Sequence, residues 1–123
     1  MAKILIIEDD TDLADTYRDF LEARGHSVIQ ATRITEATEQ LFRSNPEIIT
    51  LDLHLPGGTS TVIADFIGCV KAVGHAKVIV ISGHTEMIMG EEWLQNADLV
   101  LTKPINYQHL TVMIDRLLLT PSR

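Results

Sequence analysis

Three acidic residues stand directly after the first apolar run of the chain, and together they could hold a cation. Residues 4–7 are all Ile or Leu, and Glu8, Asp9 and Asp10 follow without a break. A pair of carboxylates about 4 Å apart repels by on the order of 4 kcal/mol at an effective dielectric constant of about 20. A folded chain therefore needs water, a proton or a cation at such a cluster, and hard oxygen ligands favour Mg²⁺ or Ca²⁺. Alternatively, Asp10 or Thr11 caps the next helix and the other acids are solvated.

Three later apolar runs also end in a polar side chain that could do chemistry: Asp52, Ser82 and Lys103. A carboxylate, already ionised at pH 7, can attack a phosphorus atom in line without a general base, so Asp52 is a candidate nucleophile for phosphoryl transfer. A divalent cation shared by Asp9 and Asp52 would neutralise the phosphoryl oxygens. Lys103 would balance the remaining negative charge, and the Ser82 hydroxyl would donate a hydrogen bond. Taken singly, each residue has a simpler role as a helix cap, a loop cap or a solvated lysine.

The composition describes one acidic domain of ordinary size. The chain has 123 residues, 46% of them hydrophobic, so it can form a real core and is not a disordered chain. Its net charge of −7 makes direct binding to nucleic acid or to a membrane surface unexpected. Cys69 is the only cysteine, which excludes a disulfide framework and a cysteine-based zinc site and fits a reducing cytoplasm. No apolar run reaches a signal-peptide core or the roughly 18 residues of a membrane span.

Apolar runs alternate with amphipathic segments along the chain, which predicts alternating strands and helices. The expected strands are residues 3–7, 27–31, 48–51, 77–81 and 99–101. The expected helices are residues 12–24, 35–43, 61–73, 86–95 and 107–119. In the second of these helices, we expect Ala37, Leu41 and Phe42 to face the core.

The expected strands are short, rich in β-branched residues and apolar on both faces, which is typical of a parallel sheet covered by helices on each side. Five strands alternating with five helices give a doubly wound α/β domain. Ligands of such domains bind beyond the carboxyl ends of the strands. The acidic cluster, Asp52, Ser82 and Lys103 all stand at such ends, so we expect them to converge on one edge of the sheet.

At these residues the chain resembles a known family, the receiver domains of two-component response regulators. Four segments carry the resemblance in matching order and spacing: ILIIEDD from residue 4, IITLDLHLPGG from residue 48, VIVISGH from residue 78 and NADLVLTKP from residue 96. The resemblance covers essentially all 123 residues and implies a single receiver domain over residues 1–123. It also implies a CheY-like (βα)5 fold of the flavodoxin type, with strand order 2-1-3-4-5 and helices on both faces. Residues 120–123 either end a single-domain regulator or begin a linker to a further domain.

The resemblance implies a Mg²⁺ site built from the first and third strands. Asp9 would ligate Mg²⁺ directly, and Glu8 would act through water. Asp52 would be both the phosphoacceptor and a metal ligand. The backbone carbonyl of His54 would be a further ligand. Asp10 falls outside this set, and we expect it to cap the following helix.

The resemblance also implies how the phosphoryl group is held. Ser82 would be the switch hydroxyl, and Lys103 would pair with the phosphoryl group. Pro104 would position the loop of Lys103, because the family commonly has a cis peptide bond there.

Two positions depart from the pattern of the family. Receivers often have an aromatic residue, which changes rotamer with the switch hydroxyl, where this chain has Val100. Valine has no ring to swing, so that form of signalling is not expected here. Ser60 stands where many relatives have glycine, and serine does not readily adopt a positive φ. A different backbone path before the third helix is the expected result.

Two histidines flank the predicted site, since His54 lies two residues after Asp52 and His84 two residues after Ser82. Gly83 between the site and His84 is small, as expected where a phosphodonor must approach. In receivers, side chains at the two histidine positions influence how fast the phosphoryl group hydrolyses, by covering it or by orienting water. The alternatives are that both histidines are exposed loop residues without a role, or that they bind a transition metal.

We therefore expect a phosphorylation-dependent switch and not an enzyme, with self-phosphorylation from a donor and autodephosphorylation as its only chemistry. The donor would be a histidine kinase or a histidine phosphotransfer protein, and phosphorylation would shift the population of two conformations. A non-phosphorylated pseudo-receiver is one alternative, although all the site residues are present. An aspartate-nucleophile phosphatase is another, but Leu53 and His54 follow Asp52 where a second catalytic carboxylate would be needed.

An output partner or a second copy of the chain is expected on the face formed by the fourth helix, the fifth strand and the last helix. Residues 86–94 have more apolar side chains than one core-facing helix requires, and the last helix has two apolar side chains off its main stripe. These residues are Met87, Ile88, Met89, Trp93, Val112 and Leu119. The alternative is that most of them pack in the core.

Overall fold

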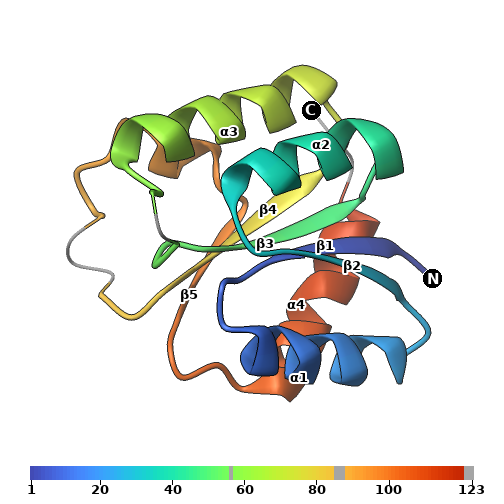
Figure 1. Cartoon of the computed structure of the whole chain (residues 1–123). Helices are drawn as coiled ribbons and strands as arrows, with labels where there is room; N and C mark the ends of the chain where they lie inside the picture. Colours follow the sequence, from blue (N-terminus) through green and yellow to red (C-terminus); the bar gives the residue numbers. More distant parts are fainter. Residues whose placement is uncertain (56, 85–87, 121–123) are drawn as a thin grey trace.

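A five-stranded parallel sheet lies at the centre of the protein, in the strand order β2-β1-β3-β4-β5 (Figure 1). This computed structural model describes residues 1–55, 57–84 and 88–120. The strands are β1 (Lys3–Ile7), β2 (Ser27–Ala31), β3 (Ile48–Asp52), β4 (Lys77–Ser82) and β5 (Leu99–Thr102). The helices are α1 (Thr11–Glu22), α2 (Ile34–Ser44), α3 (Ser60–Val73), the short 3-10 helix η2 (Glu92–Asn96) and α4 (Tyr107–Leu119). The predicted doubly wound α/β fold and its strand order are confirmed.

Helices cover both faces of the sheet, which explains why its central strands are apolar throughout. Apart from Lys3, every residue of β1, β3 and β4 is buried. Figure 1 shows α2 and α3 on one face and α1 and α4 on the other. Leu41 and Phe66 pack in the core of the first face, and Tyr17 and Ile114 pack in the core of the second. None of the helices in the described part of the chain is long and apolar enough to cross a membrane.

Polar side chains begin three of the helices. The Asp10 carboxylate accepts a hydrogen bond from the Leu13 backbone N–H at 3.1 Å, and Thr59 and Asn106 cap α3 and α4 in the same way. Each cap satisfies a backbone N–H that has no partner within its helix. Asp10 is therefore the helix cap that the sequence predicts.

Ser60 does not need the conformational freedom of the glycine that it replaces. It is the first residue of α3 and follows the Thr59 cap. The left-handed conformation in this loop falls instead on Gly57, whose φ is 73°. The departure at Ser60 is thus compatible with an ordinary helix start.

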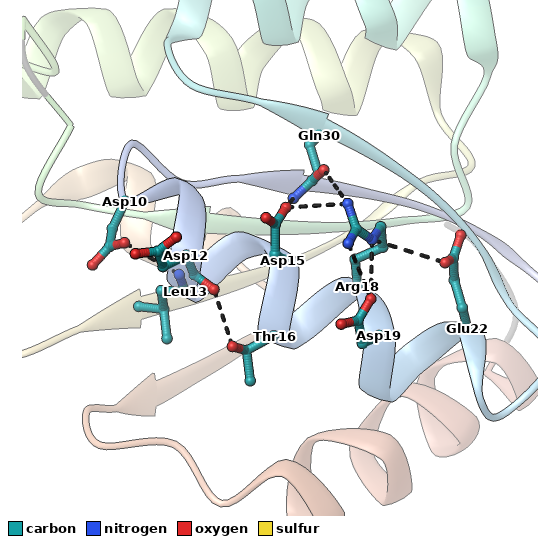
Figure 2. A network of polar contacts seen from close by, with 9 residues as sticks. All are labelled: Asp10, Asp12, Leu13, Asp15, Thr16, Arg18, Asp19, Glu22 and Gln30. Atoms are coloured by element: carbon teal, nitrogen blue, oxygen red, sulfur yellow. Dashed lines mark hydrogen bonds and ion pairs between the residues drawn. The ribbon is translucent and has the colours of Figure 1, made fainter.

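A network of polar side chains ties α1 to β2 (Figure 2). Arg18 Nη1 lies 3.1 Å from Asp15 Oδ1 and 3.3 Å from Gln30 Oε1, and the Gln30 amide donates to the same Asp15 oxygen at 3.0 Å. Asp19 and Glu22 lie on other sides of the guanidinium, at 3.1 and 3.9 Å. Because these side chains are partly exposed, each ion pair contributes little stability. The network mainly orients α1 against the edge of the sheet.

The helix predicted for residues 86–95 is wrong in the described part of this segment. Residues 88–90 form a turn, and only Glu92–Asn96 are helical, as the 3-10 helix η2. Gly90 is poorly suited to a helix interior, where glycine costs about 1 kcal/mol relative to alanine. Glu91 has extended backbone angles, so the turn at residues 88–90 and η2 do not form one continuous helix. The first part of the prediction, residues 86 and 87, lies outside the described residues.

The predicted inward face of α2 is correct for two residues and wrong for the third. Ala37 and Leu41 are fully buried, but Phe42 is 65% exposed. Successive residues of a helix are separated by about 100° around its axis. A stripe through Ala37 and Leu41 therefore turns Phe42 away from the sheet.

This difference predicts a contrast between two neighbouring alanine substitutions. Leu41→Ala should lower the free energy of unfolding by about 2–5 kcal/mol, because it leaves a cavity in the core. Phe42→Ala should change it by no more than about 0.5 kcal/mol, because the ring lies at the surface. Urea unfolding of both variants measures the contrast, and equal losses would mean that α2 packs in a different rotation.

Candidate functional site

The carboxyl ends of four strands bring the predicted site residues to one edge of the sheet. Glu8 follows β1, while Asp52 is the last residue of β3 and Ser82 is the last of β4. Lys103 comes directly after β5, and its backbone N–H donates to the Ser82 carbonyl at 2.9 Å. Parallel pairing puts these ends side by side, because β1 pairs with β3, β3 with β4 and β4 with β5. The sequence argument from strand ends is correct for the backbone positions of these residues.

Three carboxylates at this edge lie close enough together to share one cation. One oxygen from each of Glu8, Asp9 and Asp52 lies within 4.8 Å of the other two. Glu8 and Asp52 are each only 2% exposed, whereas Asp9 is exposed. Glu8 Oε1 is buried and accepts no hydrogen bond from the described residues. A donor set made only of carboxylate oxygens fits a hard divalent cation such as Mg²⁺.

Lys103 neutralises part of this cluster. Its Nζ lies 3.1 Å from Asp52 Oδ2 and 3.6 Å from Glu8 Oε1. The expected cis peptide bond between Lys103 and Pro104 is present. Burial works against the charged lysine, but the hydrogen bond to Asp52 and the two negative charges raise the pKa of Lys103 overall. The ammonium group therefore stays charged beside the two buried acids.

The Asp52 carboxylate is held in place through both of its oxygens. Oδ1 accepts a hydrogen bond from the His54 backbone N–H at 3.0 Å, and Oδ2 accepts one from Lys103. Burial by itself would raise the pKa of Asp52. Hydrogen bonds from Glu8, the His54 backbone and Lys103 outweigh burial and lower it. Asp52 is thus an ionised and oriented carboxylate.

Glu8 has the opposite protonation behaviour. Burial and the neighbouring Asp52 carboxylate raise the pKa of Glu8, and the Asp10 backbone N–H and Lys103 lower it. The net result is a pKa of about 8. The Asp10 N–H donates to Glu8 Oε2 at 3.2 Å. Without a metal ion, the two buried acids therefore share one proton, which resides on Glu8 at neutral pH.

Ser82 and two imidazoles complete the edge of the site. Ser82 is 3% exposed, and its Oγ accepts a hydrogen bond from the His84 backbone N–H at 3.1 Å. The rings of His54 and His84 are both exposed and lie beside each other, with centroids 5.8 Å apart. Gly83 leaves space beside them, since a Cβ there would lie 3.8 Å from His54 Nε2.

A buried tyrosine of α1 responds to the charge of the acidic cluster. Tyr17 on α1 is 2% exposed, and burial together with the charge of Glu8 raises its pKa. Its ring packs edge-on against Tyr107 at 5.7 Å, and Tyr107 also contacts Phe20 at 5.5 Å. The helical period of α1 can place Tyr17 on the side of the sheet, but no local pattern in the sequence indicates that the charge of Glu8 acts on its pKa.

The structure brings four of the predicted residues together and leaves one of the acids apart. Glu8, Asp9, Asp52 and Lys103 come together around the carboxylates. Asp10 is exposed and caps α1 and, as expected, is not one of the clustered carboxylates.

Comparisons with known proteins agree with this geometry. The family model of the response regulator receiver domain matches residues 4–115. The aerobic respiration control protein ArcA of Escherichia coli is 28% identical over 118 residues, which are 94% of this chain and 48% of ArcA. The chain thus spans about half the length of ArcA and of several similar curated relatives.

Solved structures share the fold at lower sequence identity. A two-component response regulator from Clostridium difficile superposes with a TM-score of 0.83 at 24% identity, over 96% of both chains. The response regulator TrrA from Thermotoga maritima, solved in complex with Mg²⁺ and BeF, has a TM-score of 0.82 at 21% identity, over 95% of this chain and 99% of TrrA.

The shifted pKa of Glu8 predicts how the stability of the metal-free protein depends on pH. A carboxyl whose pKa rises from 4.5 to about 8 on folding binds an extra proton in the folded state between these values. The stabilisation is complete below about pH 4.5 and is lost as the pH rises through about 8. In EDTA, the free energy of unfolding of wild type should therefore fall between pH 5.5 and 8.5 by on the order of 1–2 kcal/mol more than that of Glu8→Gln. Urea unfolding measures both proteins, and parallel pH profiles would show that Glu8 does not bind this proton.

Proposed function

The chain belongs to the response regulator receiver domain family, and we propose that it signals by accepting a phosphoryl group on Asp52. The family carries phosphorylation-dependent signalling in two-component systems, which makes this chain a signalling domain. The observation that carries the choice of Asp52 is its buried, ionised carboxylate, held by Lys103 within the acidic cluster.

Asp52 would act as the nucleophile towards a phosphohistidine of a histidine kinase or a histidine phosphotransfer protein. A carboxylate oxygen forms a bond to phosphorus while the phosphorus–nitrogen bond of the donor breaks and its electron pair returns to the imidazole. The lowered pKa of Asp52 supports this role, because the carboxylate needs no base to remove a proton. The His54 N–H and Lys103 hold the two oxygens and so limit how the carboxylate can turn.

Glu8, Asp9, Asp52 and the His54 backbone carbonyl would hold Mg²⁺. A bound Mg²⁺ would neutralise charge on the phosphoryl oxygens as the new bond forms. The close approach of the three carboxylates supports this assignment, as does the Mg²⁺ in the TrrA complex of the same fold. Asp9, being exposed, gives the site an open side towards the donor.

Lys103 and Ser82 would receive the phosphoryl oxygens. Lys103 lies between two negative charges and could exchange its contact with Asp52 for one with a phosphoryl oxygen without losing an ionic partner. Ser82 Oγ accepts the His84 N–H through a lone pair, which leaves its hydroxyl proton to be donated. Because Ser82 and Lys103 are also joined by a backbone hydrogen bond, a movement of one residue would shift the other. Pro104 would keep the loop of Lys103 in its place.

The exposed imidazoles of His54 and His84 would set how long the phosphoryl group lasts. They stand beside the acceptor at the surface, where they could cover it or orient water. The small Gly83 would leave room for the donor.

A partner surface would lie on α4 and on the turn before η2. Met89, Val112 and Leu119 are 72%, 42% and 86% exposed. The predicted contribution of Trp93 to this face is wrong, because its ring is 6% exposed and packs in the core. Ile88 is partly buried against the same core, and Met87 lies outside the described residues. The surface for a second copy or an output partner is therefore narrower than the sequence predicts.

The compartment would be the cytoplasm, as expected from the sequence. Cys69 is a free, half-buried cysteine, which suits a reducing environment.

Incubation with acetyl phosphate tests the proposed acceptor. Wild type with Mg²⁺ should gain the mass of one phosphoryl group, and Asp52→Asn should gain nothing, because an amide is a poor nucleophile. Intact-protein mass spectrometry follows both proteins over time. A mass gain that persists in Asp52→Asn, or no gain in wild type at any Mg²⁺ concentration, would overturn the proposal.

Two neighbouring acids provide a matched test of the Mg²⁺ site. Asp9→Ala should abolish Mg²⁺-dependent phosphorylation, because it removes one of the three clustered carboxylates. Asp10→Ala should keep it and lose only the helix cap, at about 1 kcal/mol of stability. Phosphorylation rates across a Mg²⁺ titration distinguish the two, and equal rates in both variants would remove Asp9 from the site.

A further inference from the structure

Two equivalent turns on neighbouring strands hold His54 and His84 side by side. His54 comes two residues after Asp52 at the end of β3, and its backbone N–H donates to the Asp52 side chain at 3.0 Å. His84 comes two residues after Ser82 at the end of β4, and its N–H donates to the Ser82 side chain at 3.1 Å. Because β3 and β4 are paired in parallel, with Asp52 opposite Ile81, the repeated turn brings both imidazoles to the same end of the sheet, one residue apart in register.

The separation of the two rings suits chelation of one metal ion. Their centroids are 5.8 Å apart, and their planes are inclined at 75°. With zinc–nitrogen distances of about 2.0–2.1 Å and angles near tetrahedral or somewhat wider, two imidazoles on one ion have centroids about 5–6 Å apart. The observed centroid spacing falls in this range, so the rings lie close enough together to share one ion.

The exposure and the chemistry of the two rings also suit a transition metal. Both histidines are exposed. A Cβ on Gly83 would lie 3.8 Å from His54 Nε2, so glycine at this position keeps side-chain atoms away from that nitrogen. The acidic cluster beneath is of a different chemical kind, since its ligands are carboxylate oxygens. Imidazole favours Zn²⁺, Cu²⁺ or Ni²⁺, whereas carboxylates and water suit Mg²⁺.

We propose that His54 and His84 bind one divalent transition-metal ion, with Zn²⁺ as the physiological candidate, at a site separate from the Mg²⁺ cluster. The two imidazoles supply two ligands, and water fills the remaining positions. Such an ion lies beside Asp52, where it covers the approach of a phosphodonor, so Zn²⁺ slows phosphorylation. This consequence rests on the proposed function, but the binding of the metal does not.

Isothermal titration with Zn²⁺ tests the site, with Mg²⁺ in large excess so that the acidic cluster is occupied. Wild type and Asp52→Asn should both bind one Zn²⁺ per chain. His54→Ala and His84→Ala should each weaken binding by about tenfold or more. His109→Ala is the matched control, since His109 is an exposed histidine on α4 away from this pair, and it should bind like wild type.

Three outcomes decide the proposal. Loss of binding in both histidine variants, with His109→Ala unchanged, supports it. Equal affinity in all the variants overturns it. Unchanged binding in the histidine variants together with loss in Asp9→Asn also overturns it, because the ion then occupies the acidic cluster. Since Asp52→Asn cannot be phosphorylated on Asp52, its Zn²⁺ affinity reports on the site whether or not the proposed phosphorylation is correct.

Discussion

The repulsion between two carboxylates buried at the end of an apolar sheet is the interaction on which this structure depends. Glu8 and Asp52 follow strands whose residues are almost all inaccessible to water, and both side chains are only 2% exposed. Two ionised acids in such a place would be unstable. In the metal-free protein, this repulsion is offset by the charge of Lys103, which follows β5, and by a proton on Glu8. The same need for positive charge makes the edge receptive to a divalent cation.

The counter-charge also links the site to the rest of the fold. The Lys103 ammonium group contacts both acids, and the Lys103 backbone N–H donates to Ser82, so this residue joins the ends of β1, β3 and β4 to the end of β5. The loop of Lys103 leads into α4, where Tyr107 packs on Tyr17 and Phe20 of α1. Val100, at the position where relatives often have a switching aromatic, is half-buried against the core. The segment that begins at Lys103 thus ends at the aromatic contact between α1 and α4, and that contact does not include residue 100.

The sequence predicts most of this architecture because local patterns and global topology agree. Five β-branched runs mark the strands, and the rule that parallel strands end at one edge brings Glu8, Asp52, Ser82 and Lys103 together. Asp10 is recognised as a cap because acids favour helix starts. The predicted helix at residues 86–95 fails in its described part because its apolar side chains look helical, whereas Gly90 and the burial of Trp93 favour a turn and a 3-10 helix. The raised pKa of Glu8 depends on how elements pack, which no local pattern records. The exposure of Phe42 follows from the helical period once Ala37 and Leu41 face the core.

The central claim is that this electrostatic arrangement serves to place a phosphoryl group on Asp52 and on no other acid. Reduction of the phosphorylated protein with borohydride converts an aspartyl phosphate to homoserine, and peptide mass spectrometry then locates it. The account predicts homoserine at position 52 alone, formed only when both phosphodonor and Mg²⁺ have been present. Homoserine at Asp9 or Asp10, or equal labelling in the absence of Mg²⁺, would contradict it.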